Sequence, residues 1–253
     1  MDFTLQIYKR LLETLQSSGY QFQTFETFLQ NPVEGKVVVL RHDVDLKAEN
    51  SQATAKIEHS LGICASYFFR VVPQSDKPHI IKEIASLGHE IGYHYEDMSI
   101  CEGDKEKAIA HFKDKLQYFR QFYPVKTICM HGAPRSRFDG KDLWKKYNYR
   151  DYGIIGEPYF DVDFNHVFYL TDTGRCWDGS KFSVRDKVQT TFTQSYHSTN
   201  QIITAAQDGT LPTRIMITTH PQRWTDSKPQ WFKELLLQNI KNIAKRILLL
   251  VRK

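Results

Sequence analysis

The stretch at residues 37–45, VVVLRHDVD, is the feature that most constrains how this 253-residue chain folds. Its first four residues are apolar and three of them are β-branched, which predicts a strand buried on both faces, as in the parallel sheet of an α/β protein. Such sheets bind ligands at the carboxyl ends of their strands. The polar residues that follow Leu40 therefore lie where a functional site is expected.

Asp43 and Asp45 are two residues apart, so they point the same way if the strand continues through them. Two carboxylates held close together resist joint ionisation unless a cation neutralises one of them. The pair therefore suggests a metal ligand beside a general base. The residues alone leave one alternative open, which is an aspartate-rich turn that caps a helix after Leu46.

The composition is that of a soluble globular protein, with 41% hydrophobic and 25% charged residues. The four cysteines form no C-x-x-C motif, which argues against a disulfide framework or a cysteine zinc site and fits a reducing compartment. We find no signal-peptide pattern and no candidate spanning segment. These features predict a cytoplasmic protein.

The net charge of +5 is concentrated in residues 231–253, which contain six Lys or Arg and one Glu. One interpretation is a last helix that packs its Leu/Ile stripe on the body, and this is the one that we favour. The other is a basic amphipathic helix that makes a peripheral contact with the inner face of a membrane. We do not expect nucleic-acid binding.

Predicted strands alternate with predicted helices along the chain. Helices are expected at residues 3–18, 46–61, 78–87, 105–123, 139–147 and 201–207 and from Pro229 onward, and strands at 37–40, 64–72, 89–94, 125–130, 152–155, 166–170 and 214–219. Residues 20–35 are aromatic-rich and end in Asn31, Pro32 and Gly35, which predict a loop into the buried strand. Strands separated by helices indicate repeated β/α units and a mainly parallel sheet. We therefore expect one α/β domain over residues 1–253, a distorted (β/α) barrel of seven or so strands with an N-terminal helix and a basic C-terminal helix.

Five of the predicted strands are followed by polar clusters. The clusters occupy residues 42–45 (HDVD), 94–97 (HYED), 131–135 (HGAPR), 172–177 (DTGRCW) and 220–224 (HPQRW). A single histidine at such a place would be an ordinary core or capping residue. Five clusters at matching positions on separate strands predict a shared site at one end of the barrel.

The stretch at residues 88–94, GHEIGYH, resembles the G-H-E-I-G-x-H stretch of the polysaccharide deacetylase (NodB-homology) family of carbohydrate esterases. The aspartate pair, the Trp177 segment and the TTH sequence ending at His220 follow that family's order. The resemblance covers residues 36–224 and implies a deacetylase-like barrel. It also implies metal-dependent removal of an acyl group, expected to be N-acetyl, from a sugar in cell-surface polysaccharide or glycan metabolism. The substrate would be a sugar nucleotide, a lipid-linked saccharide or a polysaccharide.

The resemblance also implies roles for individual residues. Asp43 would be the catalytic base and His220 the acid that protonates the leaving group. Asp45 and His94 would bind a divalent metal, expected to be zinc. These residue types suit the chemistry, because a carboxylate–histidine metal site polarises an acyl carbonyl and lowers the pKa of water.

The chain departs from the family at its second metal histidine, four residues after His94, where it has Met98. Methionine is not a ligand for a hard or borderline cation. We therefore expect His131 as the third metal ligand, with Glu96 or Asp97 behind it. The alternative is that metal binding has been lost.

Four further residues are expected to bind substrate: Arg135, Asp172, Trp177 and Trp224. Arg135 stands close to the family's arginine motif and is expected to orient a carboxylate, either Asp172 or Asp43. The two tryptophans either stack against the sugar or belong to the core.

Two other functions stay open on the sequence. One is a metal-free deacetylase-like protein that binds glycan or supports polysaccharide assembly without catalysis. The other is a glycosidase that uses Asp43 and Asp45 as its acid–base pair. The glycosidase is disfavoured, because its two carboxylates must flank a glycosidic bond at about 5–10 Å from each other.

Overall fold

The computed structural model describes residues 1–177 and 188–251, with the side chains of the last helix described as far as Ala244. Its centre is a sheet of seven parallel strands. In hydrogen-bonded order these are β5 (Ile128–Met130), β4 (Glu90–Tyr95), β3 (Ser66–Phe69), β2 (Val37–Val44), β7 (Arg214–Thr219) and β6 (Phe168–Thr171), and β1 (Gln21–Gln23) pairs with β2. Because all strands run the same way, their carboxyl ends meet at one end of the molecule.

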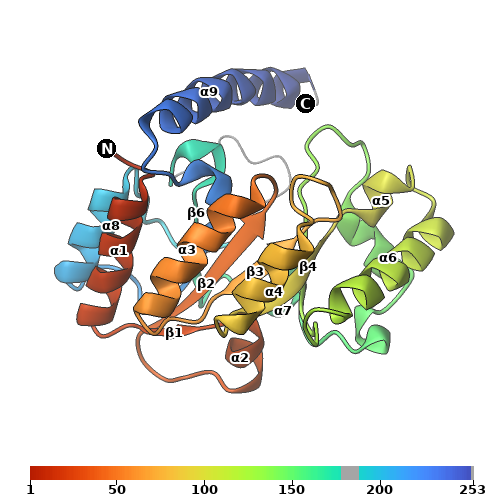
Figure 1. The fold of residues 1–253 in the computed structure, drawn as a ribbon, viewed down its shortest axis with the longest axis horizontal. Coiled ribbons are helices and arrows are strands. Elements are labelled where there is room, and N and C mark those ends of the chain that lie inside the picture. Colours follow the sequence, from red (N-terminus) through yellow and green to blue (C-terminus); the bar gives the residue numbers. More distant parts are fainter. Residues whose placement is uncertain (178–187, 252–253) are drawn as a thin grey trace.

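The sheet curls into a half-barrel with helices packed around it (Figure 1), which confirms the expected distorted β/α-barrel architecture. The α-helices are α1 (Leu5–Ser17), α2 (Phe25–Gln30), α3 (Ala48–Ser60), α4 (Pro78–Ser86), α5 (Asp97–Ile100), α6 (Lys105–Arg120), α7 (Pro158–Asp161), α8 (Thr199–Gln207) and α9 (Lys228–Val251). Short 3-10 helices are η1 (Gly140–Lys145), η2 (Tyr149–Tyr152), η3 (Thr173–Arg175) and η5 (Pro221–Arg223). Over the described residues, no helix combines the length and hydropathy needed to cross a membrane.

Strand β2 organises the sheet, since all eight of its residues are buried and it pairs with β3 and β7 along its length. Its side chains alternate between two cores, so Val38 and Leu40 pack on the helix-covered side and Val37 and Val39 on the concave side. The strand continues past Leu40, and the alternation puts Asp43 on the concave side with the two valines.

A buried network on the helix-covered side fixes β2 against its neighbours. His42 Nε2 lies 2.9 Å from Glu58 Oε1 on α3, and His42 Nδ1 lies 2.7 Å from Thr219 Oγ1 on β7. Tyr8 of α1 and Tyr67 of β3 donate to the same glutamate at 2.5 and 2.8 Å. The Glu58 carboxylate thus ties α1 and α3 to β2 and β3, and His42 extends the network to β7.

Two local features differ from the prediction. Residues 20–35 contain β1 and α2, which were not predicted, before the expected loop into β2, and α2 begins where the Thr24 hydroxyl accepts the Thr27 N–H at 3.1 Å. The expected strand at residues 152–155 is not formed, because η2 ends at Gly153 with a φ of 74°. This region adds only an isolated bridge between Thr127 and Gly156 to the described sheet.

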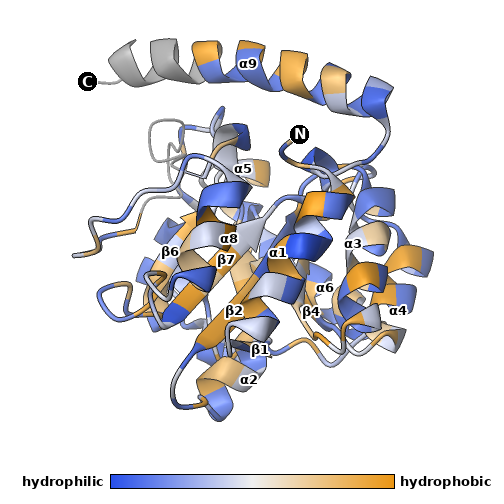
Figure 2. Ribbon diagram, turned by 90° about the vertical axis from the view of Figure 1, so that its left-hand side faces the viewer, coloured by the Kyte–Doolittle hydropathy of each residue, from blue (hydrophilic) through white to orange (hydrophobic). Residues whose placement is uncertain are grey.

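Helix α9 lies across the top of the molecule as a layer of its own, and Figure 2 shows apolar and polar residues alternating along it. It was expected to pack its Leu/Ile stripe on the body. That interpretation is wrong for its described side chains, since Leu236 and Ile240 are 65% and 56% exposed. Glu234 and Gln238 are buried in their place, at 6% and 4% exposure.

Candidate active site

A cavity of about 710 Å³ lies at the carboxyl ends of the strands. Residues from all five polar clusters line it: Asp43, Asp45, His94, Glu96, His131, Arg135, Thr173 and His220. A parallel sheet gathers the ends of separate strands in this way, so the expected common site is formed.

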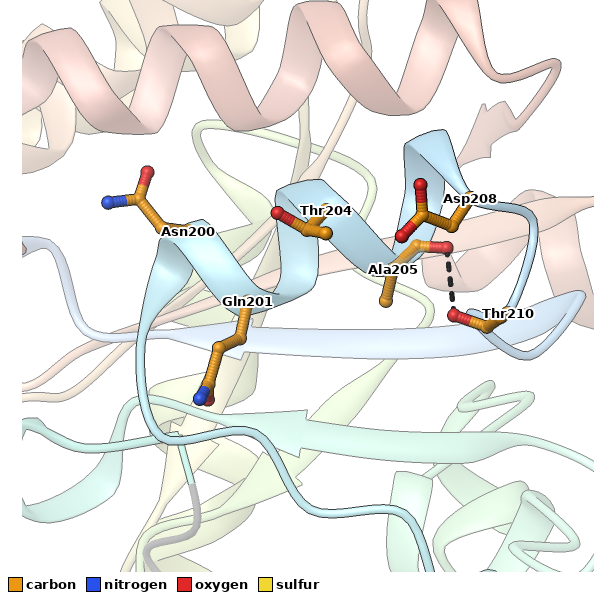
Figure 3. A pocket seen from close by; sticks show the side chains of 6 residues that line it. All are labelled: Asn200, Gln201, Thr204, Ala205, Asp208 and Thr210. Atoms are coloured by element: carbon orange, nitrogen blue, oxygen red, sulfur yellow. Dashed lines mark hydrogen bonds between the residues drawn. The ribbon is translucent and has the colours of Figure 1, made fainter.

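A smaller hollow of about 300 Å³ lies beside α8 (Figure 3). Its lining consists of Asn200, Gln201, Thr204, Ala205, Asp208 and Thr210. These six residues include one carboxylate and neither a histidine nor a cysteine, and the Thr210 hydroxyl is turned back to the Ala205 carbonyl at 3.4 Å. We therefore place the chemistry in the larger cavity.

Asp45, His94 and His131 converge on one side of this cavity. Asp45 Oδ1 lies 3.5 Å from Nε2 of His94 and 3.5 Å from Nε2 of His131. Both distances are longer than ordinary N–H···O hydrogen bonds. Asp45 Oδ1 is buried and has no hydrogen-bond partner within the described structure. A buried acceptor left in this state indicates a missing positive group.

The hydrogen-bond partners of Nδ1 in His94 and His131 determine which ring nitrogen carries the proton. His94 Nδ1 lies 2.9 Å from the Cys129 carbonyl oxygen, and His131 Nδ1 lies 2.8 Å from Glu96 Oε2. Each of these oxygens only accepts, so each Nδ1 carries the proton and Nε2 of the neutral ring carries a lone pair. A lone pair on each Nε2 therefore faces the same carboxylate oxygen, an arrangement that a divalent cation bound at Asp45 would stabilise.

The electrostatics of this group agree with its geometry. Burial raises the pKa of Asp45, but His131, His94 and His220 outweigh it and hold the pKa well below its usual range. Burial lowers the pKa of His94, while Asp43 and Asp45 raise it, with the net result above its usual range. A proton on His94 can thus supply part of the charge that an ion would supply.

Glu96 is the carboxylate behind His131. It also binds Arg70, whose Nε and Nη2 lie 2.8 and 2.9 Å from its two oxygens. Burial raises the pKa of Glu96, but His131 and Arg70 bring it to about 2. Asp97, the other expected candidate, instead accepts from Tyr93 at 3.0 Å and is fully buried away from the cavity.

Met98 is 3% exposed and belongs to the apolar core. The position at which the family's second metal histidine was expected therefore does not reach the cavity wall. His131, which follows β5, lies beside Asp45 instead.

Asp43 is held by Arg41 of the same strand, whose Nε and Nη2 lie 2.8 and 2.6 Å from its two oxygens. Burial raises the pKa of Asp43, but Arg41 and His94 bring it below its usual range. Sequence reasoning missed Arg41, although its i, i+2 spacing from Asp43 was a signal that both share one face of the strand.

A second group of possible ligands is Asp43, His94 and Cys129, all buried, with ligand atoms within 4.8 Å of one another. Both oxygens of Asp43 are bonded to the Arg41 guanidinium. This positive charge repels a cation at the same carboxylate. The geometry therefore favours Asp45 with His94 and His131.

His220 stands on the other side of the cavity and is fixed by Asp172. Its Nδ1 lies 2.6 Å from Asp172 Oδ1, and its backbone N–H donates to Oδ2 at 3.0 Å. Arg223 and the Trp224 indole also donate to Asp172, the latter at 2.8 Å. Burial raises the pKa of Asp172, yet Arg223 and His220 bring it to about 2. His220 Nε2 is left facing Asp45 Oδ2 at 3.8 Å.

Three of the four expected substrate-binding residues are placed elsewhere. Asp172 is fully buried and its oxygens are occupied by donors, so it orients His220 and does not face the cavity. Trp177 and Trp224 are 3% and 1% exposed and pack on Phe3, with ring centroids 6.3 and 5.1 Å from it. They are core residues, and neither can stack against a sugar.

Arg135 does line the cavity, with an exposed side chain. The arginines that bond Asp43 and Asp172 in the described structure are Arg41 and Arg223, so the orienting role expected of Arg135 falls to them. Arg135 is left at the mouth of the cavity.

Helix α9 supplies a wall of the cavity that the sequence did not predict. Glu234, Gln238 and Lys241 line it. Glu234 Oε2 lies 3.5 Å from Lys47 Nζ, and Asn242 donates to the Gly174 carbonyl at 2.9 Å. The polar face of the last helix thus docks beside the site.

Comparison with protein-family models and with curated proteins found no match. Among solved structures, similar folds occur in carbohydrate esterases of family CE4. A CE4 family pseudoenzyme from Bacillus anthracis is 14% identical, with a TM-score of 0.44 over 81% of this chain and 60% of that chain. A family 4 carbohydrate esterase from Bacillus anthracis is 11% identical, with a TM-score of 0.40 over 92% of this chain and 85% of that one. PdaA of Bacillus subtilis, also a family 4 carbohydrate esterase, is 11% identical, with a TM-score of 0.40 over 90% and 84%. The chain therefore spans 60% of the length of the pseudoenzyme.

Proposed function

We propose that this protein is a metal-dependent hydrolase that removes an acyl group, first of all N-acetyl, from a sugar. One observation carries the proposal. The buried oxygen Asp45 Oδ1 has no hydrogen-bond partner in the described structure and lies 3.5 Å from Nε2 of both His94 and His131. A separately oriented carboxylate and a third histidine share the same cavity.

Asp45, His94 and His131 would hold the metal, and zinc suits a set of two imidazoles and a carboxylate. When bound, the ion would polarise the acyl carbonyl and lower the pKa of the attacking water. Glu96 and the Cys129 carbonyl fix the two imidazoles in the tautomer that binding requires.

Asp43 would take the proton from the attacking water. Its contact with Arg41 keeps it ionised at neutral pH, because the net pKa lies below its usual range. His220 would give a proton from Nε2 to the leaving nitrogen or oxygen. Asp172 accepts from His220 Nδ1 and stabilises the imidazolium that acts as the acid.

The cavity volume of about 710 Å³ lies within the range of small-molecule sites and accommodates a sugar unit with its acyl group. Arg135 and Lys241 are exposed where they line it. Their charges suit the phosphate of a sugar nucleotide or of a lipid-linked saccharide.

The metal-free glycan-binding protein is the second candidate. Met98 in place of a metal histidine favours it, and so does the raised pKa of His94, because a proton there offsets some of the carboxylate charge. This candidate predicts a cavity that binds sugar in chelator without loss of affinity.

Metal analysis separates the two candidates. The protein is purified without added metal, loaded with zinc, desalted and analysed for elements. We expect about one ion per chain in the parent and in Asp208→Ala, which removes an exposed carboxylate in the hollow beside α8, and none in Asp45→Ala. His131→Ala should weaken binding by more than the roughly 10- to 100-fold that outer partners contribute, while Cys129→Ser should not.

The reverse result, with Cys129→Ser losing the ion and His131→Ala keeping it, would move the metal to the Asp43 group. Acetate release from acetylated sugars is measured on the same samples. A parent that holds no ion and releases no acetate, yet binds sugar, would establish the metal-free candidate.

A further inference from the structure

Helix α9 has its polar side turned toward the body of the protein. Glu234, Gln238 and Asn242 recur every four residues and are buried to between 4% and 8% exposure. Glu234 reaches Lys47, and Asn242 donates to the Gly174 carbonyl. The polar face is therefore the docked face.

The opposite face of α9 is apolar and uncovered. Its exposed residues are Phe232, Leu236, Leu237, Ile240 and Ile243, with between 41% and 65% of each side chain accessible. A surface helix normally turns its apolar stripe to the core. Figure 2 shows this helix outside the rest of the molecule, so the stripe faces away from the body.

We propose that this outer face of α9, defined by those five residues, docks on the surface of an anionic lipid bilayer. Residues 231–253 contain six Lys or Arg and one Glu. That glutamate is Glu234, which is buried against the body and lies 3.5 Å from Lys47. By sequence, this segment is cationic, and its one carboxylate does not face outward. An exposed apolar stripe on a cationic helix suits a layer of anionic headgroups.

Charge favours an anionic bilayer over a second copy of the chain as the partner of this outer face. Packing two such helices against each other would bring cations together, with no carboxylate in residues 231–253 other than the inward Glu234 to pair with them. Like charges at close range are destabilising. Anionic lipid provides the opposite charge that this cationic segment lacks.

Docking would place the cavity beside the membrane, because α9 supplies both surfaces. Gln238 and Lys241 line the cavity, and the outer face lies on the far side of the same helix. A helix with its side chains is about 10–12 Å across. Resting on the proposed function, this favours a saccharide carried on a lipid phosphate as the substrate.

The test is vesicle co-sedimentation of the full chain, which needs no turnover and is read separately from the metal and acetate assays. Vesicles of phosphatidylcholine with one-third phosphatidylglycerol are compared with pure phosphatidylcholine. We expect the parent to bind the anionic vesicles at low salt and to be released at high salt. The double variant Leu236→Gln with Ile240→Gln should bind these vesicles at least about tenfold more weakly than the parent does.

The matched control is Ile100→Gln with Phe160→Gln, which removes two apolar side chains of 45% and 49% exposure from the body. It should bind as the parent does, and circular dichroism checks that both variants are folded. The proposal would be overturned if the two double variants bound anionic vesicles equally, or if the parent did not bind them. So would light scattering that shows a parent dimer dissociated by the α9 changes.

Discussion

On one side of the cavity His220 is bonded to Asp172 at 2.6 Å, and the backbone of His220, Arg223 and Trp224 fill the remaining acceptor sites of that carboxylate. On the other side His94 and His131 stand 3.5 Å from Asp45, too far for a hydrogen bond. Both sides use a histidine whose Nδ1 is fixed by an oxygen. They differ in what the histidine's other nitrogen meets.

On the side with His220, both oxygens of Asp172 and Nδ1 of His220 are paired within the protein, so the orientation of this histidine needs no ligand. The side with Asp45 places imidazole nitrogens against an unpartnered carboxylate oxygen, and added positive charge would stabilise this arrangement. On the proposed function, an ion would complete the Asp45 side, and the oriented His220 would transfer a proton.

The largest expected effect comes from the two proton-transfer residues. Asp43→Asn and His220→Ala should each lower kcat by roughly 10²- to 10⁴-fold while the metal stays bound. For an activated aryl ester, whose leaving group needs no proton, the loss in His220→Ala should shrink and the loss in Asp43→Asn should not. Steady-state kinetics on both substrates checks this, with bound metal quantified in each variant. Loss of the ion from Asp43→Asn would show that Asp43 is a ligand and not a base.

Smaller effects are expected for Glu96, which supports the Asp45 side of the cavity, and for Asp172, which supports the His220 side. Glu96→Gln should weaken metal binding by roughly 10- to 100-fold and leave kcat at saturating metal nearly unchanged, because Glu96 fixes the His131 tautomer. Asp172→Asn should do the opposite, lowering kcat and sparing metal affinity, because it acts on His220. Metal titration against a chromophoric chelator and kinetics at saturating metal measure the two. If both variants changed metal affinity equally, the two sides would be one coupled unit.

Much of this site was predictable because it follows from strand β2 and its neighbours. An apolar run marks the buried strand, parallel pairing brings the strand ends together, and Asp43, Asp45, His94, His131 and His220 accordingly line one cavity. Local sequence and the direction of the strands are enough for this step.

The partners of these residues were less predictable. Asp172 meets His220 only because β6 pairs with β7, and the sequence does not state which strands are adjacent. Trp177 and Trp224 are core residues because α1 brings Phe3 over them. Helix α9 reverses the rule that the apolar stripe faces the core, so a periodicity argument places the wrong face inward.

The smallest expected effect is on acid stability, and it tests how strongly Asp172 is held. Its folded pKa of about 2 lies below the unfolded value of 3.8, so the unfolded chain binds more protons between these values. The stability that Asp172 contributes is therefore complete above pH 4 and is lost as the pH falls through 2. Across this window the free energy of unfolding of the metal-free parent should fall by about 2 kcal/mol relative to that of Asp172→Asn. Denaturant unfolding in excess chelator measures this difference in unfolding free energy at each pH.

Glu157 gives a control of opposite sign, since burial raises its pKa to about 7 and its stability contribution falls as the pH rises from 4.5 toward 7. The difference in unfolding free energy between the parent and Glu157→Gln should therefore change between pH 4.5 and pH 7 and stay constant below pH 4. A difference for Asp172→Asn that stays constant from pH 5 to pH 2 would mean that Arg223 and His220 do not hold the carboxylate as tightly as their contacts indicate. The His220 side would then depend on a ligand for its order, as the Asp45 side does.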